Sequence, residues 1–221
     1  MTEPTDLRLN KGSASAGITT PARQLHHGIL AAFADTGRPP GPQDLEDYTH
    51  DHGIDLEPAL RELTGCDLLA VDHRGRIRAA YPFSPTPTRH SVTWAGGPTT
   101  HAMCAVDALG MSAMLDHPAV ITSTEPGSDA TITIRVDRDQ ATWTPDTAVV
   151  LAGTTTDDGC CPSADRTCGY INFFTSAQAA CNWADAHPEI TATVLDQTQA
   201  LASGITEFGA LLQPTSETRP A

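Results

Sequence analysis

The chain has 221 residues, of which 39% are hydrophobic and 5% aromatic, so its core must be built mainly from Ala, Val, Leu and Ile. Its 27 Asp and Glu residues outnumber its 13 Lys and Arg residues, which gives a formal charge of −14. This acidic balance argues against nucleic acid as a partner, because phosphate backbones are repelled. No stretch approaches the roughly 18 apolar residues of a membrane span, so no membrane partner is expected either.

The opening stretch, residues 1–19, lacks the apolar centre of a signal peptide. Its composition predicts a short disordered arm. We therefore expect a cytoplasmic protein, and in that compartment thiols stay reduced. The six cysteines are then expected to bind metal or to act in catalysis, rather than to form structural disulfides.

Residues 20–83 have the pattern of a winged-helix-like region, in which three helices precede a β-ribbon. The helices are expected over residues 20–37, 41–53 and 54–67, because Pro or Asp marks each start and Gly follows the first two. Two strands are expected over residues 68–83, on either side of an Arg-Gly turn.

Winged-helix regions often bind DNA through one of their helices. Here residues 41–67 carry eight acidic side chains against the single basic Arg61. A recognition helix of that charge would be repelled by the duplex, so a structural role is expected instead. The eight acids are Asp44, Glu46, Asp47, Asp51, Asp55, Glu57, Glu62 and Asp67.

Residues 84–100 are rich in Pro and Gly and predict a crossing connection with one short strand, over Ser91–Trp94. Residues 101–221 predict a thiol-bearing α+β domain with a mixed or antiparallel sheet. Its expected elements are a helix over 107–115, a hairpin over 119–137, strands over 147–153 and 169–174, a helix over 176–188, and a strand and a helix within 192–213.

One helical turn separates Cys104 from Asp107, at the start of the helix expected over 107–115. The N-terminus of a helix favours an anion, and the thiolate is the reactive form of cysteine. A carboxylate beside a thiolate raises the pKa of the thiol, so the pair suits a proton relay. The alternative is a buried cysteine whose aspartate neighbour only caps the helix.

Three further thiols, Cys160, Cys161 and Cys168, lie within nine residues, in "CCPSADRTC". They lack the two Cys-x-x-Cys knuckles of a structural zinc site. The pattern indicates a thiol-rich loop for a soft metal or for thiol exchange. The alternative is a loop with an incidental vicinal pair or a labile disulfide.

The other candidate ligands carry no metal-binding spacing. Cys66 and Cys181 lie on predicted helices, where we expect them to be small core residues. The nine histidines are scattered over polar stretches and are expected at the surface; they include the pairs His26–His27 and His50–His52.

Together, several segments resemble the organomercurial (alkylmercury) lyase family. "MCAVDALGMSAML" resembles the family's Cys-x-x-Asp with its apolar helix, and "AVITSTEPGSDATITIRVD" the hairpin that follows. "CGYINFFTSAQAACNWADAHPEI" and "LASGITEFGALLQ" are similar to the family's later segments. The resemblance covers roughly residues 20–213. It implies an α+β catalytic domain of alkylmercury-lyase type behind a winged-helix-like N-terminal region.

The resemblance also implies roles for individual residues. Cys104 and Cys168 match the two catalytic cysteines, whose thiolates bind the mercury of a small organomercurial, and Asp107 matches the aspartate that relays a proton to carbon. No cofactor is implied, because mercury arrives with the substrate and leaves with the product, to a small thiol or a mercuric reductase. Met103 departs from the family, where an aromatic residue is common. The insert holding Cys160 and Cys161 is a second departure, and these thiols would receive Hg²⁺ or bind a different metal.

Two other functions stay open from the sequence. A lyase-like homologue with the same thiols would bind copper, zinc or mercury, or carry out other thiol chemistry. A metal-responsive winged-helix regulator would need a basic DNA-binding surface, which the charge count contradicts.

Overall fold

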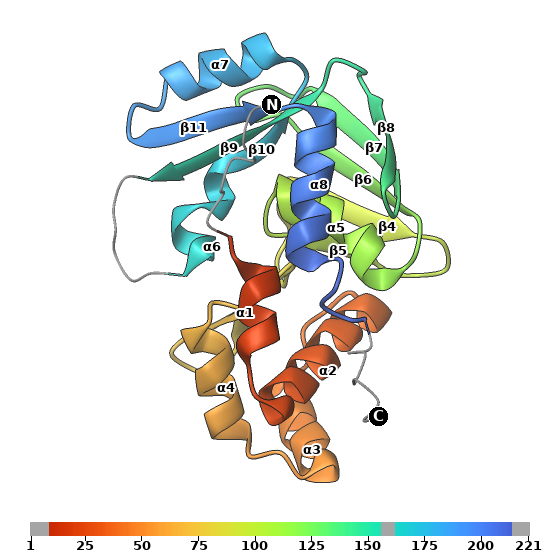
Figure 1. The fold of residues 1–221 in the computed structure, drawn as a ribbon, viewed down its shortest axis with the longest axis vertical. Coiled ribbons are helices and arrows are strands. Elements are labelled where there is room, and N and C mark those ends of the chain that lie inside the picture. Colours follow the sequence, from red (N-terminus) through yellow and green to blue (C-terminus); the bar gives the residue numbers. More distant parts are fainter. Residues whose placement is uncertain (1–8, 156–161, 214–221) are drawn as a thin grey trace, which may run out of the picture.

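The structure is a computed structural model that describes residues 9–155 and 162–213. Figure 1 shows helices α1 to α4 at one end of an elongated molecule and strands β6 to β11 toward the other, while β1 packs against α4. Helices α5 and α8 lie between these strands, packed against each other. This confirms the predicted α+β class. Within the described residues, no helix combines the length and apolarity that a bilayer crossing requires.

The three helices predicted at the N-terminal end are present as α2 (Thr20–Thr36), α3 (Pro42–His52) and α4 (Leu56–Gly65). Gly37 and Gly53 follow the first two with positive φ, which favours glycine and ends each helix. Helix α2 packs against α4 with an apolar stripe that is fully buried. The stripe consists of Leu25, Ile29, Leu30 and Phe33.

The expected disordered arm is wrong for its described part, because Lys11–Gly17 form helix α1. Leu9 and Ile18, on either side of this helix, are 5% exposed, and Lys11 is fully buried. Two apolar anchors and a buried amine with acceptors compensate the entropy cost of ordering a polar segment. Composition alone does not reveal these tertiary partners.

An eight-stranded antiparallel sheet forms the larger β-layer, in the order β1-β2-β3-β5-β4-β6-β7-β8. The expected ribbon is its edge, since β1 pairs with β2, and β3 connects the pair to β5. The winged-helix description of this region stays a prediction. The strands are β1 (Leu69–Val71), β2 (Ile77–Ala80), β3 (Phe83–Ser84), β4 (His90–Trp94), β5 (Thr99–Ala102), β6 (Ala119–Thr124), β7 (Thr131–Asp137) and β8 (Gln140–Thr144).

The segment 84–100 is more regular than the connection predicted for it. The expected short strand is β4, but β3 and β5 also begin or end in this segment, and β4 lies between β5 and β6. The predicted hairpin is present as β6 and β7, in the register Ala119↔Val136 to Thr124↔Thr131. Strand β8 was not predicted. The sheet therefore runs without a break from the N-terminal ribbon to the predicted catalytic domain.

A second, three-stranded antiparallel sheet has the order β10-β9-β11. Helix α7 packs on it, and Ser176 accepts a hydrogen bond from the N–H of Ala179 at the predicted cap. The remaining elements are β9 (Val149–Thr155), α6 (Ser163–Arg166), β10 (Ile171–Phe174), α7 (Ala177–Asp185), β11 (Ile190–Leu195) and α8 (Gln197–Phe208).

Helix α5 (Ala105–Leu115) is the centre of the molecule, packed against α8 and against strands of both sheets. Gly110 and Gly204 let the two helices touch: a Cβ at Gly204 would lie 2.8 Å from the backbone nitrogen of Gly110. With helices and sheets around it, α5 has buried residues on all sides. Its first turn is thereby held inside the protein.

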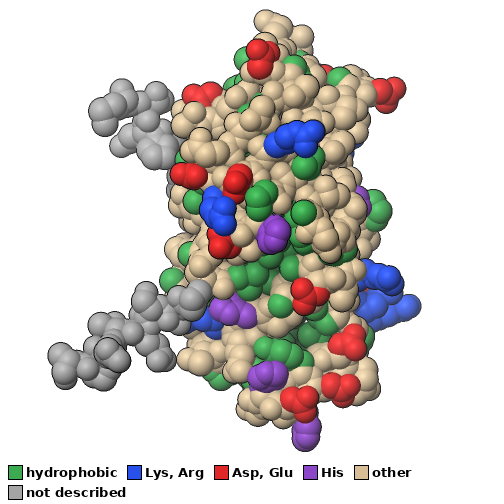
Figure 2. All heavy atoms as spheres, turned by 90° about the vertical axis from the view of Figure 1, so that its right-hand side faces the viewer, with side chains coloured by type: hydrophobic (Ala, Val, Ile, Leu, Met, Phe, Trp, Pro, Cys, Tyr) green, Lys and Arg blue, Asp and Glu red, His purple; other side chains and the backbone are tan. Residues whose placement is uncertain are grey.

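The exposed surface of α3 is acidic, with Asp44, Glu46, Asp47 and Asp51 all exposed. Figure 2 shows Asp, Glu and His side chains gathered at this end of the molecule. The acidic charge that the sequence places in this region is thus exposed on α3, and the expected absence of a nucleic-acid partner stays a prediction.

Candidate active site

The candidate site begins at the junction between β5 and α5. Cys104 is the N-cap of α5, with an extended backbone, and its sulfur accepts a hydrogen bond from the N–H of Asp107 at 3.5 Å. The thiol in turn donates to Oδ2 of Asp107. The second carboxylate oxygen, Oδ1, is buried without a hydrogen-bond partner among the described residues. The i, i+3 spacing thus places thiol and carboxylate in direct contact.

Cys168 comes from a distant part of the sequence to the same place. It begins a single 3₁₀ turn, Cys168–Tyr170, between α6 and β10. The Sγ atoms of Cys104 and Cys168 and a carboxylate oxygen of Asp107 all lie within 4.8 Å of one another. The three residues are at most 3% exposed. The structure therefore brings together the three residues that the sequence singles out.

Burial controls the protonation of this cluster. It raises the pKa of Asp107 to about 7, and the hydrogen bond from Cys104 and the charge of Lys11 only partly oppose it. Burial, followed by the hydrogen bond with Cys168 and the charge of Asp107, raises the pKa of Cys104 well above its usual range. Cys104 consequently rests as a thiol, beside a carboxyl group that changes its protonation state near neutral pH.

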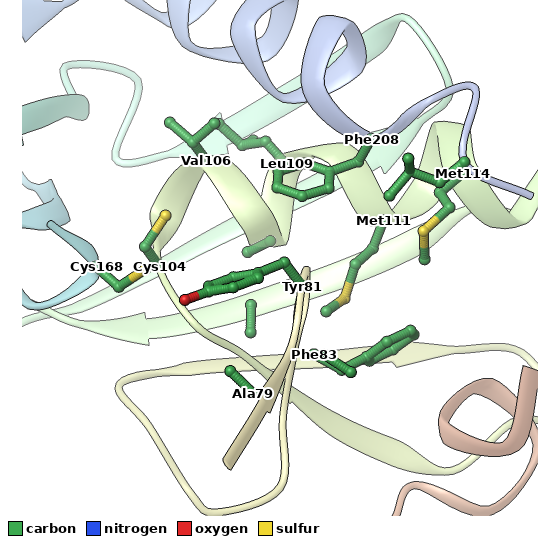
Figure 3. Close-up of a cluster of buried hydrophobic side chains, with 14 of the residues drawn as sticks. Ala79, Tyr81, Phe83, Cys104, Val106, Leu109, Met111, Met114, Cys168 and Phe208 are labelled. Atoms are coloured by element: carbon green, nitrogen blue, oxygen red, sulfur yellow. The ribbon is translucent and has the colours of Figure 1, made fainter. Parts of the chain in front are cut away.

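Sequence reasoning missed Tyr81 and Lys11, which lie next to the cluster. Figure 3 shows the Tyr81 ring among the buried side chains, with its hydroxyl end toward Cys104 and Cys168. The Lys11 ammonium lies 3.9 Å from the centre of that ring. One signal was available: Lys11 is the only lysine in the sequence.

The remaining cysteines divide into two groups. Cys66 and Cys181 are exposed, so the prediction that they are core residues is wrong. Cys66 is the C-cap of α4 and Cys181 lies on the solvent side of α7, so neither side chain is part of the core. Cys160 and Cys161 fall outside the described residues. Their expected role with metal stays a prediction.

Two histidines contradict the expected surface location. His26 is fully buried on α2, and neither ring nitrogen has a hydrogen-bond partner in the described chain. His90 is 2% exposed, with Nδ1 at 2.9 Å from the Ser123 hydroxyl. Burial lowers the pKa of each to about 3, so both are neutral. Their burial follows from helix and sheet packing that the local sequence does not show.

A cleft of about 600 Å³ borders the site. Its walls include the Pro39–Pro42 loop, the β1–β2 turn and the loop after β3. Met103, the residue before Cys104, and Ala164, four residues before Cys168, also line it. Cys104, Asp107 and Cys168 do not line the cleft themselves, so it passes beside the site through these chain neighbours.

Two cysteine sulfurs side by side form a soft donor pair, suited to a soft metal ion of low coordination number. A buried carboxylate with a pKa near 7, in contact with one of them, can hold or release a proton at neutral pH. The combination permits thiolate capture of a soft metal together with proton delivery to a group bound to it. It does not depend on a redox step.

Comparisons with known proteins indicate one family. The family model for alkylmercury lyase matches residues 83–209, more than half of the chain. The chain belongs to the alkylmercury lyase family. This membership identifies it as an enzyme of the lyase class, and the three clustered residues all lie inside the matched range.

Individual relatives agree with this family. An alkylmercury lyase of Streptomyces lividans is 32% identical over 152 residues, which cover 67% of this chain and 66% of the relative. One of Staphylococcus epidermidis is 28% identical over 149 residues, 67% of each chain. The crystal structure of the mercury-bound form of MerB2 shares the fold, with a TM-score of 0.72 and 23% identity, and the match covers 94% of this chain and 99% of that one.

Proposed function

We propose that this lyase cleaves the carbon–mercury bond of a small organomercurial by protonolysis. Cys104 and Cys168 bind the mercury, and Asp107 carries the proton. The observation that supports this proposal is the buried cluster itself, in which two thiols and a carboxylate with a pKa of about 7 lie within 4.8 Å of one another. Mercury is here part of the substrate and product, and no resident cofactor takes part.

The first step is capture of the substrate R–Hg–X. Cys104 donates its S–H to Asp107, so the proton moves to the carboxylate as the sulfur–mercury bond forms. X⁻ leaves, and the proton of the Cys168 thiol accompanies it as HX when the second sulfur binds. Mercury is then bound to two sulfurs and to carbon. Two thiolate donors increase the electron density on that carbon and make it more basic.

The second step is proton transfer to carbon. Protonated Asp107 gives its proton to the carbon atom, R–H leaves, and Hg²⁺ stays between the two thiolates. One thiol proton has entered R–H and the other HX, so atoms and charges balance. Burial excludes water, which would otherwise compete with the carboxyl group for the reacting carbon.

The cleft beside Met103 and Ala164 supplies the approach for the substrate. Its walls combine Pro, Leu and Ile side chains, which suit an apolar organic group, with the charged Asp72, Arg76 and Arg78. The thioether of Met103 is a soft contact for mercury on its way to Cys104. The product leaves by exchange with free thiols, to a small thiol or a mercuric reductase.

The test is benzene release from phenylmercury in excess thiol, for the wild type and for Cys104→Ala, Cys168→Ala and Asp107→Ala. Cys181→Ala is the matched control, because Cys181 is an exposed thiol that does not belong to the buried cluster. Benzene from the wild type and the control, with a sharp loss in the three site variants, supports the proposal. Stoichiometric mercury binding without benzene, unaffected by loss of Asp107, contradicts it and favours a metal-binding homologue.

A further inference from the structure

We propose that Lys11, Asp67 and Tyr81 are positioning residues for Cys168. They hold the start of α6, and with it the second thiol, against the first. All three precede residue 83 and lie outside the family match. The role given to Cys168 as a mercury ligand rests on the proposed function, whereas the contacts that hold it do not.

Asp67 holds Ser163, the first residue of α6. Both of its carboxylate oxygens accept a hydrogen bond from the N–H of Ser163, each at 3.2 Å. The Ser163 hydroxyl also donates to Oδ2 of Asp67. Ser163 is 4% exposed and the Asp67 side chain 31% exposed, so these bonds lie at the edge of the buried region, and their loss would leave the buried Ser163 groups without a partner.

Lys11 completes this contact from α1. Its side-chain amine donates to the carbonyl oxygen of Asp67 at 2.6 Å, to Oδ2 of Asp67 at 2.5 Å and to the Ser163 hydroxyl at 3.2 Å. Each of the three ammonium protons therefore has an acceptor. Glu207 on α8 fixes the backbone of the same residue, accepting the Lys11 N–H at 2.6 Å. A fully satisfied buried cation is a rigid point of attachment.

Tyr81 holds the next residue, Ala164. The Ala164 N–H donates to the Tyr81 hydroxyl at 2.7 Å, and Tyr81 is fully buried with its hydroxyl end toward the two cysteines. The Lys11 ammonium lies over the ring of the same tyrosine, 3.9 Å from its centre. The same amine thus connects the holders of Ser163 and Ala164.

The chain from these anchors to the thiol is short. Helix α6 has four residues and ends at Arg166, and Cys168 begins the next turn. The N–H of Thr167 donates a hydrogen bond to the Ser163 carbonyl at 2.9 Å, which fixes the distance between these two residues. Displacing Ser163 or Ala164 therefore displaces the Cys168 sulfur. Because mercury must be bound by both sulfurs, a small shift is enough to weaken binding.

The experiment measures whether the two thiols can be bridged. The probe is phenylarsine oxide, which forms two As–S bonds and releases water, with iodoacetamide as the reagent for a single thiol. The full chain is used with Cys66, Cys160, Cys161 and Cys181 replaced by Ala, so that only the two site thiols react. The test variants are Asp67→Asn, Lys11→Met and Tyr81→Phe.

We expect Asp67→Asn and Lys11→Met to lower phenylarsine oxide affinity by about ten- to a hundredfold. Iodoacetamide should label both thiols of every variant after denaturation, which shows that the thiols are present and reduced. Tyr81→Phe keeps the ring and should lower the affinity several-fold. Arg61→Gln is the matched control: it breaks an exposed ion pair of the same region, with Glu57, and should leave the affinity unchanged.

Unchanged phenylarsine oxide affinity in folded Asp67→Asn and Tyr81→Phe would overturn the proposal, even if their melting temperatures fall, since the contacts would then only stabilise the fold. These two variants decide the question if Lys11→Met does not fold. Asn is tolerated at position 67, where φ is +53°. The bridging assay needs no carbon–mercury cleavage. An enzyme that releases no benzene yet loses bridging in these variants refutes the lyase proposal and leaves this one standing.

Discussion

Two regions of the molecule each bury an ionisable side chain in which at least one nitrogen or oxygen atom has no hydrogen-bond partner within the described residues. On α2 it is His26, and at the start of α5 it is one oxygen of Asp107. Burial favours the neutral form of both, lowering the pKa of His26 to about 3 and raising that of Asp107 to about 7. Asp107 lies in a cluster with two thiols, whereas His26 belongs to no such cluster among the described residues. A buried polar group without a hydrogen-bond partner therefore indicates a functional site when reactive groups surround it. Without such neighbours it indicates only a loss of stability that the packing of the core imposes.

The largest effect expected from this comparison is at Asp107. Asp107→Asn keeps the shape of the side chain but removes the proton carrier, so benzene release from phenylmercury should fall by about 10²- to 10⁴-fold. Mercury binding by the two thiols should persist. Single-turnover benzene release and mercury retention measure the two properties separately. Full activity of this variant would show that the buried carboxylate of Asp107 takes no more part in the chemistry than His26 does.

The second prediction concerns His26 and the pH dependence of stability. The unfolded chain binds a proton at His26 below its ordinary pKa of 6.5, whereas the folded chain does so only near 3. Folding stability therefore falls as pH decreases below 6.5, by about 1.4 kcal/mol per pH unit from this group. Asp107 acts in the opposite direction between 3.8 and 7, because its folded pKa is raised.

The contribution of His26 is isolated by comparison with His26→Leu. Urea unfolding of both proteins between pH 7 and 4.5 should show the wild type losing stability relative to the variant, by ~2–3 kcal/mol at the acidic end. If the unfolding free energies of the two proteins changed with pH in parallel, His26 would be hydrated or paired in solution. The comparison of His26 with Asp107 as two buried groups would then be wrong.

The third prediction tests the packing that encloses Asp107. A Cβ at Gly110 would collide with the backbone carbonyl of Gly204 on α8, so Gly110→Ala should cost about 1–3 kcal/mol of stability through overpacking. Gly65→Ala is the control, because Gly65 ends α4 and a Cβ added there would have no atom of another part of the chain within 4 Å. Thermal unfolding compares them. Equal stability of the two variants would show that α5 and α8 can move apart freely.

The smallest effect expected is a pH dependence of the reaction. Capture requires an ionised Asp107, so kcat/KM should fall about tenfold per pH unit below a pKa of about 7 and level off above it. The His26→Leu variant should keep the same inflection, because His26 takes no part in the chemistry. A flat profile for the wild type, or an inflection that moves with His26, would contradict the assignment of Asp107 as proton acceptor.

The sequence determined most of the local structure and the identity of the candidate site. Helix starts and ends follow from residues such as Gly37, Gly53 and Ser176, because capping and positive φ act within one turn of chain. The contact of Cys104 with Asp107 follows from the same local geometry. The resemblance of several segments to the alkylmercury lyase family added Cys168. The spacing of residues in the sequence does not connect Cys168 to Cys104.

Tertiary structure alone decided the environment of these groups. Lys11 is in a stretch expected to be disordered, and His26 was expected at the surface, yet both are fully buried. Their burial depends on partners 56 or more residues away for Lys11, and on the packing of α2 for His26. The same holds for the pKa of Asp107, which is set by burial rather than by its neighbours in sequence. Local sequence fixes backbone geometry over one turn, whereas solvation is a property of the whole packed chain.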